Sequence, residues 1–319
     1  MDTPSPNSNK LIVFGGTASR HLSGEVCRLL NTQEGELEVQ RFSDGETAIK
    51  ILNNVRGADC CVIQSTCTPV NDNLVELLLT VDALRRASAD KVNVVMPYYG
   101  YGRQDRKDQG RVALSAKLVA NLIVKAGADR IICIDLHAAQ IQGFFDIPVD
   151  HLLALPVMVD YLKKTDMDRN IVVVSPDVGN VKRARNYAAR LDSPLAIIDK
   201  RRPEPNVSEV MNIIGDIEGK RCFMFDDMID TAGTLCNGAQ ALMDRGAESV
   251  LACASHAVLS GPAKDRIAAS VLEEVIVTDS ILQTDDGDTS KLKVVSIAPL
   301  LAEAIHRIHC HLSVSALFD

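Results

Sequence analysis

The sequence has no tryptophan among its 319 residues, and aromatic residues make up only 4% of it. It also has no apolar run long enough to cross a bilayer, and its polar start, MDTPSPNSNK, lacks the apolar core of a signal peptide. Hydrophobic residues still make up 46% of the chain, so we expect a globular protein with an aliphatic core, a cytoplasmic location and no membrane partner.

Excess positive charge is missing as well. The 34 Lys and Arg residues are outnumbered by 42 Asp and Glu residues, which gives a formal net charge of −8 at pH 7. Affinity for a nucleic-acid backbone comes mainly from Lys and Arg, so the composition argues against a nucleic-acid partner. Any anion site must therefore be built locally.

The nine cysteines show no C-x-x-C spacing, which gives no indication of a zinc site. Cys60 and Cys61 are adjacent inside an apolar run. The cysteines are therefore predicted to be small buried hydrophobic residues of a protein from a reducing compartment.

Short aliphatic runs recur along the chain, and segments with helical spacing lie between most of them. Continuous apolar strands that alternate with helices predict an α/β fold, in which helices flank mostly parallel sheets. The runs are LIVF at 11–14, CCVI at 60–63, VNVVM at 92–96, RIICI at 130–134, IVVV at 171–174, LAII at 195–198, CFMF at 222–225, VLACA at 250–254, EVIV at 274–277 and KVVSI at 293–297.

A junction of small residues follows three predicted helices and leads into a strand, as ASADKV, AGADRI and RGAESV. Because this unit occurs in both halves of a chain long enough for two domains of about 150 residues, we predict two similar α/β domains. The predicted domains are 1–151 and 152–304, and we expect the final segment, 305–319, to pack back on the first.

Polar segments follow five of the predicted strands. Ligands of parallel α/β sheets bind outside the carboxyl ends of the strands, so these segments are the candidates for a site. They are PYYGYGRQDRKDQGR after 92–96, DLHAAQ after 130–134, SPDVGNVKR after 171–174, DKRRPEP after 195–198 and DDMIDTAGT after 222–225.

The last of these segments has the features of a phosphate site. Thr231, Gly233 and Thr234 lie between a strand and a helix that we expect to begin near Leu235. Backbone N–H groups at a helix N-terminus, together with hydroxyl groups and the helix dipole, favour a bound phosphate.

Carboxylates precede this loop at Asp226, Asp227 and Asp230. Ionised carboxylates accept hydrogen bonds from the neighbouring hydroxyls of a sugar, so a ribose phosphate would satisfy both halves of the stretch. The alternative is a Thr helix cap with acidic solubilising residues. The density of three Asp residues in five positions favours the sugar-phosphate site.

DDMIDTAGT resembles the phosphoribosyl pyrophosphate motif of the type I phosphoribosyltransferase fold, and nearly the whole chain is similar to the bacterial ribose-phosphate pyrophosphokinase family. The resemblance implies that fold, and an enzyme (a ribose-phosphate diphosphokinase) that transfers the diphosphoryl group of Mg-ATP to the C1 hydroxyl of ribose 5-phosphate. The products, for nucleotide biosynthesis, would be phosphoribosyl pyrophosphate and AMP. The similar segments are RFSDGE at 41–46, NDNLVELL at 71–78, YGRQDRKD at 101–108, DLHAAQIQGFFDIPVD at 135–150, SPDVGNVKRA at 175–184, DKRRPEPN at 199–206 and LLAEAIHR at 300–307.

The resemblance also implies roles for individual residues. Lys200 and Arg202 would belong to a mobile catalytic loop that closes over the triphosphate, and His137 and Asp177 match the Mg²⁺ positions. The ribose 5-phosphate site would comprise Asp226, Asp227, Asp230, Thr231, Ala232, Gly233 and Thr234. The ATP site would comprise Phe42, Asp44, Glu46, Arg103, Gln104 and His137, with Phe42 and Arg103 on the two faces of adenine. In the family RFSDGE comes from a neighbouring subunit, so a homo-oligomer, a hexamer as in the family, is implied.

Some positions depart from the family pattern. Gly110, Ala113 and Asn54 replace residues of the regulatory phosphate and ADP site, while Arg56 and Arg111 remain to bind an anion there. We therefore expect allosteric control to differ from that of relatives. Asn180 replaces a common Gly in SPDxGG, and because Asn tolerates a left-handed conformation, the turn can survive.

Two alternatives stay open at this point. One is a non-catalytic associated or regulatory protein of the same fold, in which insertions and altered catalytic loops are expected. Here DKRRPEPN, DLH and DDMIDTAGT are uninterrupted, which favours the enzyme. The other is a phosphoribosyltransferase that consumes the compound, which would not form AMP from ATP.

Overall fold

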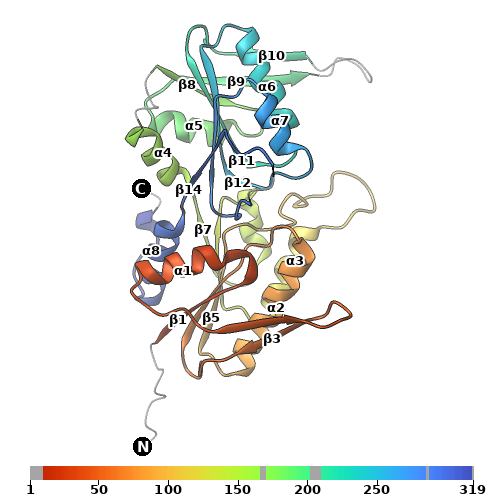
Figure 1. Cartoon of the computed structure of the whole chain (residues 1–319), viewed down its shortest axis with the longest axis vertical. Coiled ribbons are helices and arrows are strands. Elements are labelled where there is room, and N and C mark those ends of the chain that lie inside the picture. Colours follow the sequence, from red (N-terminus) through yellow and green to blue (C-terminus); the bar gives the residue numbers. More distant parts are fainter. Residues whose placement is uncertain (1–9, 166–169, 202–209, 285–286, 318–319) are drawn as a thin grey trace, which may run out of the picture. The chain divides into compact units, whose positions relative to one another are not determined.

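The computed structural model describes residues 10–165, 170–201, 210–284 and 287–317 (Figure 1). The chain divides into two compact units. The first contains Met1–Leu153, Ser280–Leu282 and Ile297–Asp319, and the second contains Ala154–Asp279 and Gln283–Ser296. No helix in the described part of the chain is both long and apolar enough to span a membrane.

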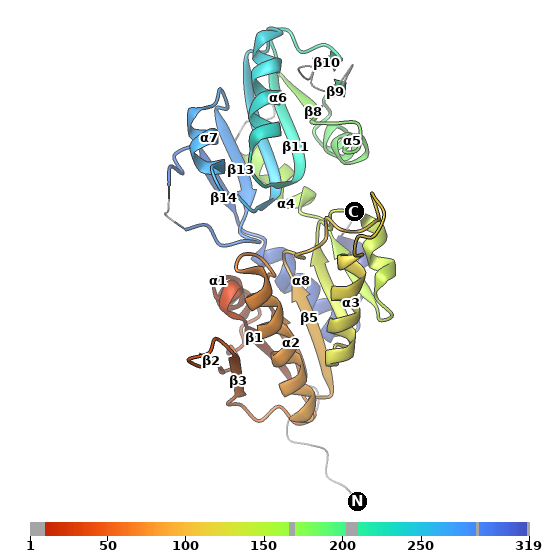
Figure 2. The same cartoon turned by 90° about the vertical axis from the view of Figure 1, so that its right-hand side faces the viewer.

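The first unit is built on a parallel five-stranded sheet with the order β1-β4-β5-β6-β7. Helices α2 and α3 lie side by side on one face, and α1 packs against α8 (Figure 2). The strands are β1 (Leu11–Gly15), β4 (Asp59–Ile63), β5 (Lys91–Met96), β6 (Arg130–Ile134) and β7 (Val149–Leu152). The helices are α1 (Arg20–Leu29), α2 (Val70–Arg86), α3 (Ser115–Ala126) and α8 (Ala298–His309), with short 3-10 turns at Thr17–Ser19, Ala139–Phe144 and Ser315–Leu317.

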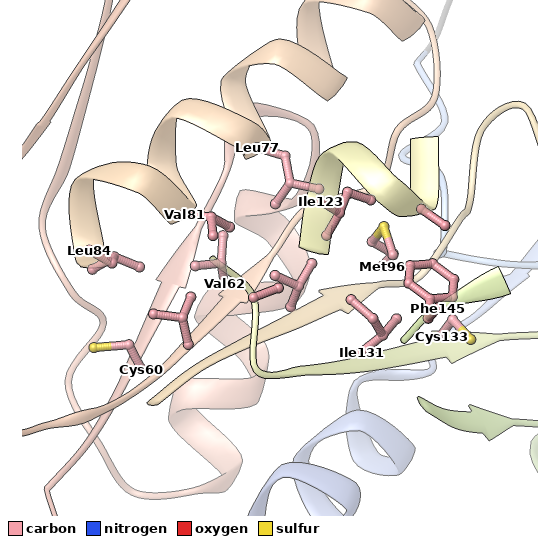
Figure 3. Close-up of a cluster of buried hydrophobic side chains, with 14 of the residues drawn as sticks. Cys60, Val62, Leu77, Val81, Leu84, Met96, Ile123, Ile131, Cys133 and Phe145 are labelled. Atoms are coloured by element: carbon pink, nitrogen blue, oxygen red, sulfur yellow. The ribbon is translucent and has the colours of Figure 1, made fainter. Parts of the chain in front are cut away.

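The core of this unit lies between the sheet and helices α2 and α3 (Figure 3). Leu77 and Val81 of α2 are buried against Val62 of β4, and Ile123 of α3 is buried near Ile131 of β6. Burial of each such side chain stabilises the fold by roughly 1.5–3 kcal/mol, which explains why runs of aliphatic residues suffice without tryptophan. Seven of the nine cysteines, Cys60 and Cys61 among them, are buried as predicted, whereas Cys236 is half-buried and Cys310 is exposed, so the prediction was wrong for these two.

A separate antiparallel hairpin, β2 (Leu37–Arg41) and β3 (Thr47–Ile51), carries RFSDGE at its turn (Figure 1). The Gly45 N–H donates to the carbonyl oxygen of Phe42 at 2.9 Å, and Gly45 has φ 93°. A residue with a side chain rarely adopts that conformation, so the glycine allows this turn.

The second unit contains a seven-stranded sheet with the order β10-β9-β8-β11-β12-β13-β14, in which only the β10–β9 pair is antiparallel. The strands are β8 (Ile171–Ser175), β9 (Leu195–Arg201), β10 (Val210–Ile214), β11 (Arg221–Ile229), β12 (Ser249–Ala257), β13 (Glu274–Thr278) and β14 (Leu292–Val295). The helices are α4 (Leu155–Lys164), α5 (Val181–Arg190), α6 (Gly233–Asp244) and α7 (Ala263–Ala269).

Helices cover both faces of this sheet, with α5 and α6 on opposite sides of β11 (Figure 2). Successive side chains of β11 point to opposite faces of the sheet. Phe225 stacks on Tyr187 of α5, with ring centroids 3.8 Å apart, whereas Met224 lies against Gly238 of α6. Together the two units confirm the predicted α/β fold class, since every predicted aliphatic run forms a strand.

The structure corrects the predictions in several places. Strands β2, β3, β7 and β10 were not predicted. Strand β9 continues to Arg201, so Lys200 lies in a strand and not in a loop, and β11 continues to Ile229. Asn180 has φ −89°, so no left-handed conformation is needed there. The C-terminal segment of the first unit begins at Ile297, earlier than the 305–319 segment that we expected.

Candidate ribose-phosphate and nucleotide site

A pocket of about 250 Å³ lies in the second unit, where β8 and β11 end and α6 begins. It combines the end of IVVVSPD with the whole DDMIDTAGT loop, two segments about 50 residues apart in sequence. Its lining residues are Pro176, Asp177, Asp226, Met228, Ile229, Asp230, Thr231, Ala232, Gly233, Thr234 and Leu235. Of the predicted ribose 5-phosphate residues, only Asp227 is not in this lining.

The phosphate loop turns into α6 at Ala232, whose φ of 58° is left-handed. The helix begins at Gly233, slightly earlier than the predicted start near Leu235, and none of the described side chains caps its N-terminus. The first N–H groups of a helix have no partner within it, and the helix dipole adds positive potential at that end. The loop therefore offers backbone donors to an anion.

The adjacent carboxylates of Asp226 and Asp227 lie at different depths. Asp227 is only 3% exposed, whereas Asp226 lines the pocket. Burial raises the pKa of the Asp226 carboxyl, and the neighbouring Asp227 and Asp177 carboxylates raise it further. A cation or a hydroxyl donor bound here would relieve this unfavourable burial of charge.

Asn180, which the sequence did not identify as a site residue, joins two of these carboxylates. Its backbone N–H donates to Asp177 Oδ1 at 2.9 Å, and its side-chain Nδ2 donates to Asp226 Oδ1 at 3.0 Å and to Asp177 Oδ2 at 3.5 Å. Ser175 Oγ also donates to the Asp177 carbonyl oxygen at 2.7 Å. The only indication in the sequence was the departure from the glycine of relatives.

Two further residues that the sequence did not identify contact the loop from the segment after β12. The Ser260 hydroxyl donates to Asp230 Oδ1, and its N–H donates to the Asp230 carbonyl oxygen at 3.1 Å. Arg266 Nη1 donates to the Thr231 carbonyl oxygen at 2.9 Å. These residues lie about 30 positions from the motif, so no local pattern could reveal them.

The predicted adenine-site residues of RFSDGE lie at the hairpin turn of the first unit. Phe42 is 58% exposed, and its N–H donates to the Glu46 carbonyl oxygen at 2.9 Å. Asp44 Oδ1 accepts the Glu46 N–H at 3.1 Å. An aromatic ring held in solvent on an ordered turn is suited to contact a ligand or another protein surface.

The other predicted ATP residues follow β5 and β6. Arg103 and Gln104 are exposed, and the Gln104 backbone is fixed by bonds to Tyr101 O at 3.0 Å and from Ala116 N at 3.2 Å. His137 is also exposed. The preceding Leu136 N–H donates to His151 Nε2 at 2.9 Å, so the loop that carries His137 is anchored to β7.

The two predicted catalytic cations are only partly described. The backbone of Lys200 lies in β9 and pairs with Met211 of β10, while its side chain is not described. Arg202 lies outside the described residues. Within the described part of the chain, no group of three or more His, Cys, Asp or Glu side chains could hold a metal ion.

The predicted regulatory residues are attached to opposite ends of two neighbouring strands of the first sheet. Arg56 precedes β4, with its N–H bonded to Asn54 Oδ1 at 3.2 Å, whereas Arg111 precedes α3 after the carboxyl end of β5. The strands of this parallel sheet are about 16 Å long. The two arginines of one chain are therefore poorly placed to bind one anion together.

The fold and the pocket define an α/β protein of the type I phosphoribosyltransferase class. Residues 11–127 match the family model for the N-terminal domain of ribose phosphate pyrophosphokinase, and residues 201–319 match that for the phosphoribosyl synthetase-associated domain. The chain belongs to the ribose-phosphate pyrophosphokinase family.

Curated relatives and a solved structure are similar to this protein over nearly the full chain. The ribose-phosphate pyrophosphokinase of Clostridium tetani is 54% identical over 311 residues, or 97% of each chain. That of Bacillus subtilis is 53% identical over 309 residues, again 97% of each. The crystal structure of phosphoribosylpyrophosphate synthetase from Mycobacterium smegmatis matches with TM-score 0.89 and 42% identity, covering 94% of this chain and 99% of that one.

Proposed function

We propose that the protein is a ribose-phosphate diphosphokinase, which transfers the β,γ-diphosphoryl group of Mg-ATP to the C1 hydroxyl of ribose 5-phosphate. The products are phosphoribosyl pyrophosphate and AMP. The observation that carries this proposal is the pocket that joins Asp177 and Asp226 to the N-terminus of α6, in a chain 54% identical to a named pyrophosphokinase over 97% of its length. That similarity favours the enzyme over a non-catalytic relative.

The pocket accounts for binding of the sugar phosphate. The N–H groups at the start of α6 and the hydroxyls of Thr231 and Thr234 bind the 5-phosphate, while Asp226 and Asp230 accept hydrogen bonds from the ribose hydroxyls. In this proposal the C1 hydroxyl is the one presented to the second substrate. The residues thereby orient the attacking hydroxyl, which is the main task in phosphoryl transfer.

Mg²⁺ is the cofactor of this proposal. Asp177 and Asp226 provide hard oxygen ligands, and the raised pKa of Asp226 indicates a carboxyl group that a cation would stabilise in its charged form. His137 is the further candidate from the family match. When bound, Mg²⁺ neutralises charge on the phosphates of ATP.

The remaining roles follow the family match. Phe42 and Arg103 hold adenine, with Asp44, Glu46 and Gln104 beside it, and Lys200 and Arg202 neutralise charge on the transferring group. The exposed Phe42 supports a nucleotide site that is completed by a neighbouring subunit, and hence a homo-oligomer such as a hexamer. Arg56 and Arg111 would then bind a regulatory anion only from different subunits. A cytoplasmic location fits these roles.

An assay of nucleotide products tests the function. Purified protein is incubated with Mg-ATP, with and without ribose 5-phosphate, and AMP and phosphoribosyl pyrophosphate are measured. Both products should form only when all three components are present. ADP as the nucleotide product would overturn the reaction, and AMP release without the sugar would indicate a different acceptor.

A further inference from the structure

The proposed sugar-phosphate pocket has a charge balance that opposes its ligand. Asp177, Asp226 and Asp230 line it, and none of the described lining residues is Lys or Arg. A phosphate monoester carries a charge of about −1.5 to −2 near pH 7. The N-terminus of α6 supplies only about +0.5 of an elementary charge, so a cation close to the loop would strengthen binding.

Arg266 of α7 is such a cation. Its Nη1 donates to the Thr231 carbonyl oxygen at 2.9 Å, and a Cβ built on Gly233 would lie 3.5 Å from the same nitrogen. The guanidinium group therefore bonds to the loop before Ala232 and lies close to Gly233 after it. It does so from outside the pocket, since Arg266 is not among the lining residues.

We propose that Arg266 is a further determinant of ribose 5-phosphate binding, which fixes the conformation of the phosphate loop and adds positive charge behind it. A carbonyl oxygen directed at the phosphate would repel it. The bond to Arg266 holds the Thr231 carbonyl oxygen away, and leaves the N–H groups of the loop for the anion. This inference rests on the proposed function of the pocket.

The position of Arg266 is itself fixed by contacts between its segment and the loop. The Leu259 N–H donates to the Ile229 carbonyl oxygen at 3.0 Å, and the Ser260 N–H donates to that of Asp230 at 3.1 Å. On the other side, Cys236 Sγ of α6 lies 3.6 Å from the Arg266 carbonyl oxygen. Because these contacts already order the backbone, little further entropy is lost when the guanidinium group binds the loop.

Direct binding measurements test this role. Ribose 5-phosphate is titrated by calorimetry into the full chain without ATP, and the KM for ribose 5-phosphate is measured in parallel. Arg266→Met should weaken binding and raise that KM roughly threefold to tenfold, with kcat little changed, because an exposed charged contact contributes modestly. Arg266→Lys keeps the positive charge and should lose less affinity for ribose 5-phosphate.

Lys264→Met is the matched control, because it removes the same charge from the same helix. Lys264 Nζ donates to the Thr284 carbonyl oxygen at 2.8 Å, so this variant should bind like the wild type. If both variants lost the same affinity for ribose 5-phosphate, the net charge of the protein would explain the effect, and the proposal would be overturned.

Arg266→Gln serves if Arg266→Met does not fold, because it keeps a polar group without the charge. Wild-type affinity in a folded Arg266→Met or Arg266→Gln protein would overturn the proposal. Failure of the wild type to bind ribose 5-phosphate would instead refute the proposed function of the pocket.

Discussion

Asn180 illustrates how one side chain sets the electrostatics of the pocket. Its amide nitrogen donates to Asp226 Oδ1 at 3.0 Å and to Asp177 Oδ2 at 3.5 Å, so it offers a shared donor to two carboxylates that would otherwise repel each other. Asn180→Asp replaces this donor with a third carboxylate. We expect the KM for ribose 5-phosphate to rise at least about tenfold, measured by initial rates.

Asn180→Gly is the control for this prediction, because the family pattern places glycine there. It removes the amide without adding charge, so its KM should rise less than that of the Asp variant. Identical kinetics for wild type and Asn180→Asp would show that the amide does not influence the site.

The raised pKa of Asp226 predicts that the stability of the fold depends on pH. Burial and neighbouring carboxylates raise its pKa in the folded state above the unfolded value near 4, so the folded state binds the proton more tightly. Stability is therefore lost as the pH rises from about 4 through the raised pKa. Asp226→Asn should raise Tm at pH 8 but change it little near pH 4, measured by scanning calorimetry without ligands.

Asp288→Asn provides a comparison of opposite sign. Hydrogen bonds from Ser290 lower the pKa of the exposed Asp288 carboxyl. This carboxylate therefore stabilises the fold at pH values above its pKa in the unfolded state. The substitution should lower Tm slightly at pH 8. A higher Tm at pH 8 in both variants would indicate that reduced net charge, and not burial of Asp226, causes the effect.

Lys200 and Arg202 are expected to act on the transition state. Cations that neutralise developing charge in phosphoryl transfer contribute on the order of 10³-fold in kcat, whereas residues that only bind ATP change KM. Replacing either by Ala should lower kcat by orders of magnitude with small changes in KM. Arg201→Ala is the control and should be mild; equal damage from all three would indicate general electrostatic attraction.

The segment after β5 links the fold to the predicted ATP site. The Gly100 N–H donates to Thr66 Oγ1 at 2.6 Å, and a Cβ on Gly100 would lie 2.3 Å from the Thr66 carbonyl oxygen. Gly100→Ala must therefore displace the backbone just before Arg103. We expect a loss of about 1–3 kcal/mol in the free energy of unfolding and a higher KM for ATP.

Gly110→Ala is the matched control in the same segment, since a Cβ there would meet nothing within 4 Å. Denaturant unfolding and ATP kinetics of the two variants separate the effect of the contact from that of an added methyl group. If the Gly100→Ala protein were as stable and active as Gly110→Ala, the contact between Gly100 and Thr66 would not support the predicted ATP site.

How far the sequence predicts each element depends on burial. Strands such as β8 are buried throughout and follow directly from their aliphatic runs. The hairpin strands β2 and β3 are half-exposed, and polar residues interrupt their apolar ones, so no continuous aliphatic run marked them. The phosphate loop was predictable because one continuous segment forms it. Asn180 and Arg266 were not, because only the fold brings their segments to the loop.

The assembled molecule is expected to complete the nucleotide site between subunits. Phe42 is 58% exposed on its hairpin, so Phe42→Ala should leave the fold intact and raise the KM for ATP. Arg103→Ala, from an exposed position on another segment, should have a similar effect. If the two residues on either side of adenine come from different chains, defects in separate chains can compensate each other in a mixed oligomer.

Co-expression of the two variants with different tags tests this arrangement. In randomly mixed oligomers, about one quarter of the sites would combine an intact Phe42 from one chain with an intact Arg103 from the other. Activity at low ATP should therefore exceed that of either variant alone, and light scattering should show an oligomer. If both residues act within one chain, every site keeps one defect, and the mixed oligomer would be no more active than its parents. A fully active wild-type monomer would equally contradict the shared site.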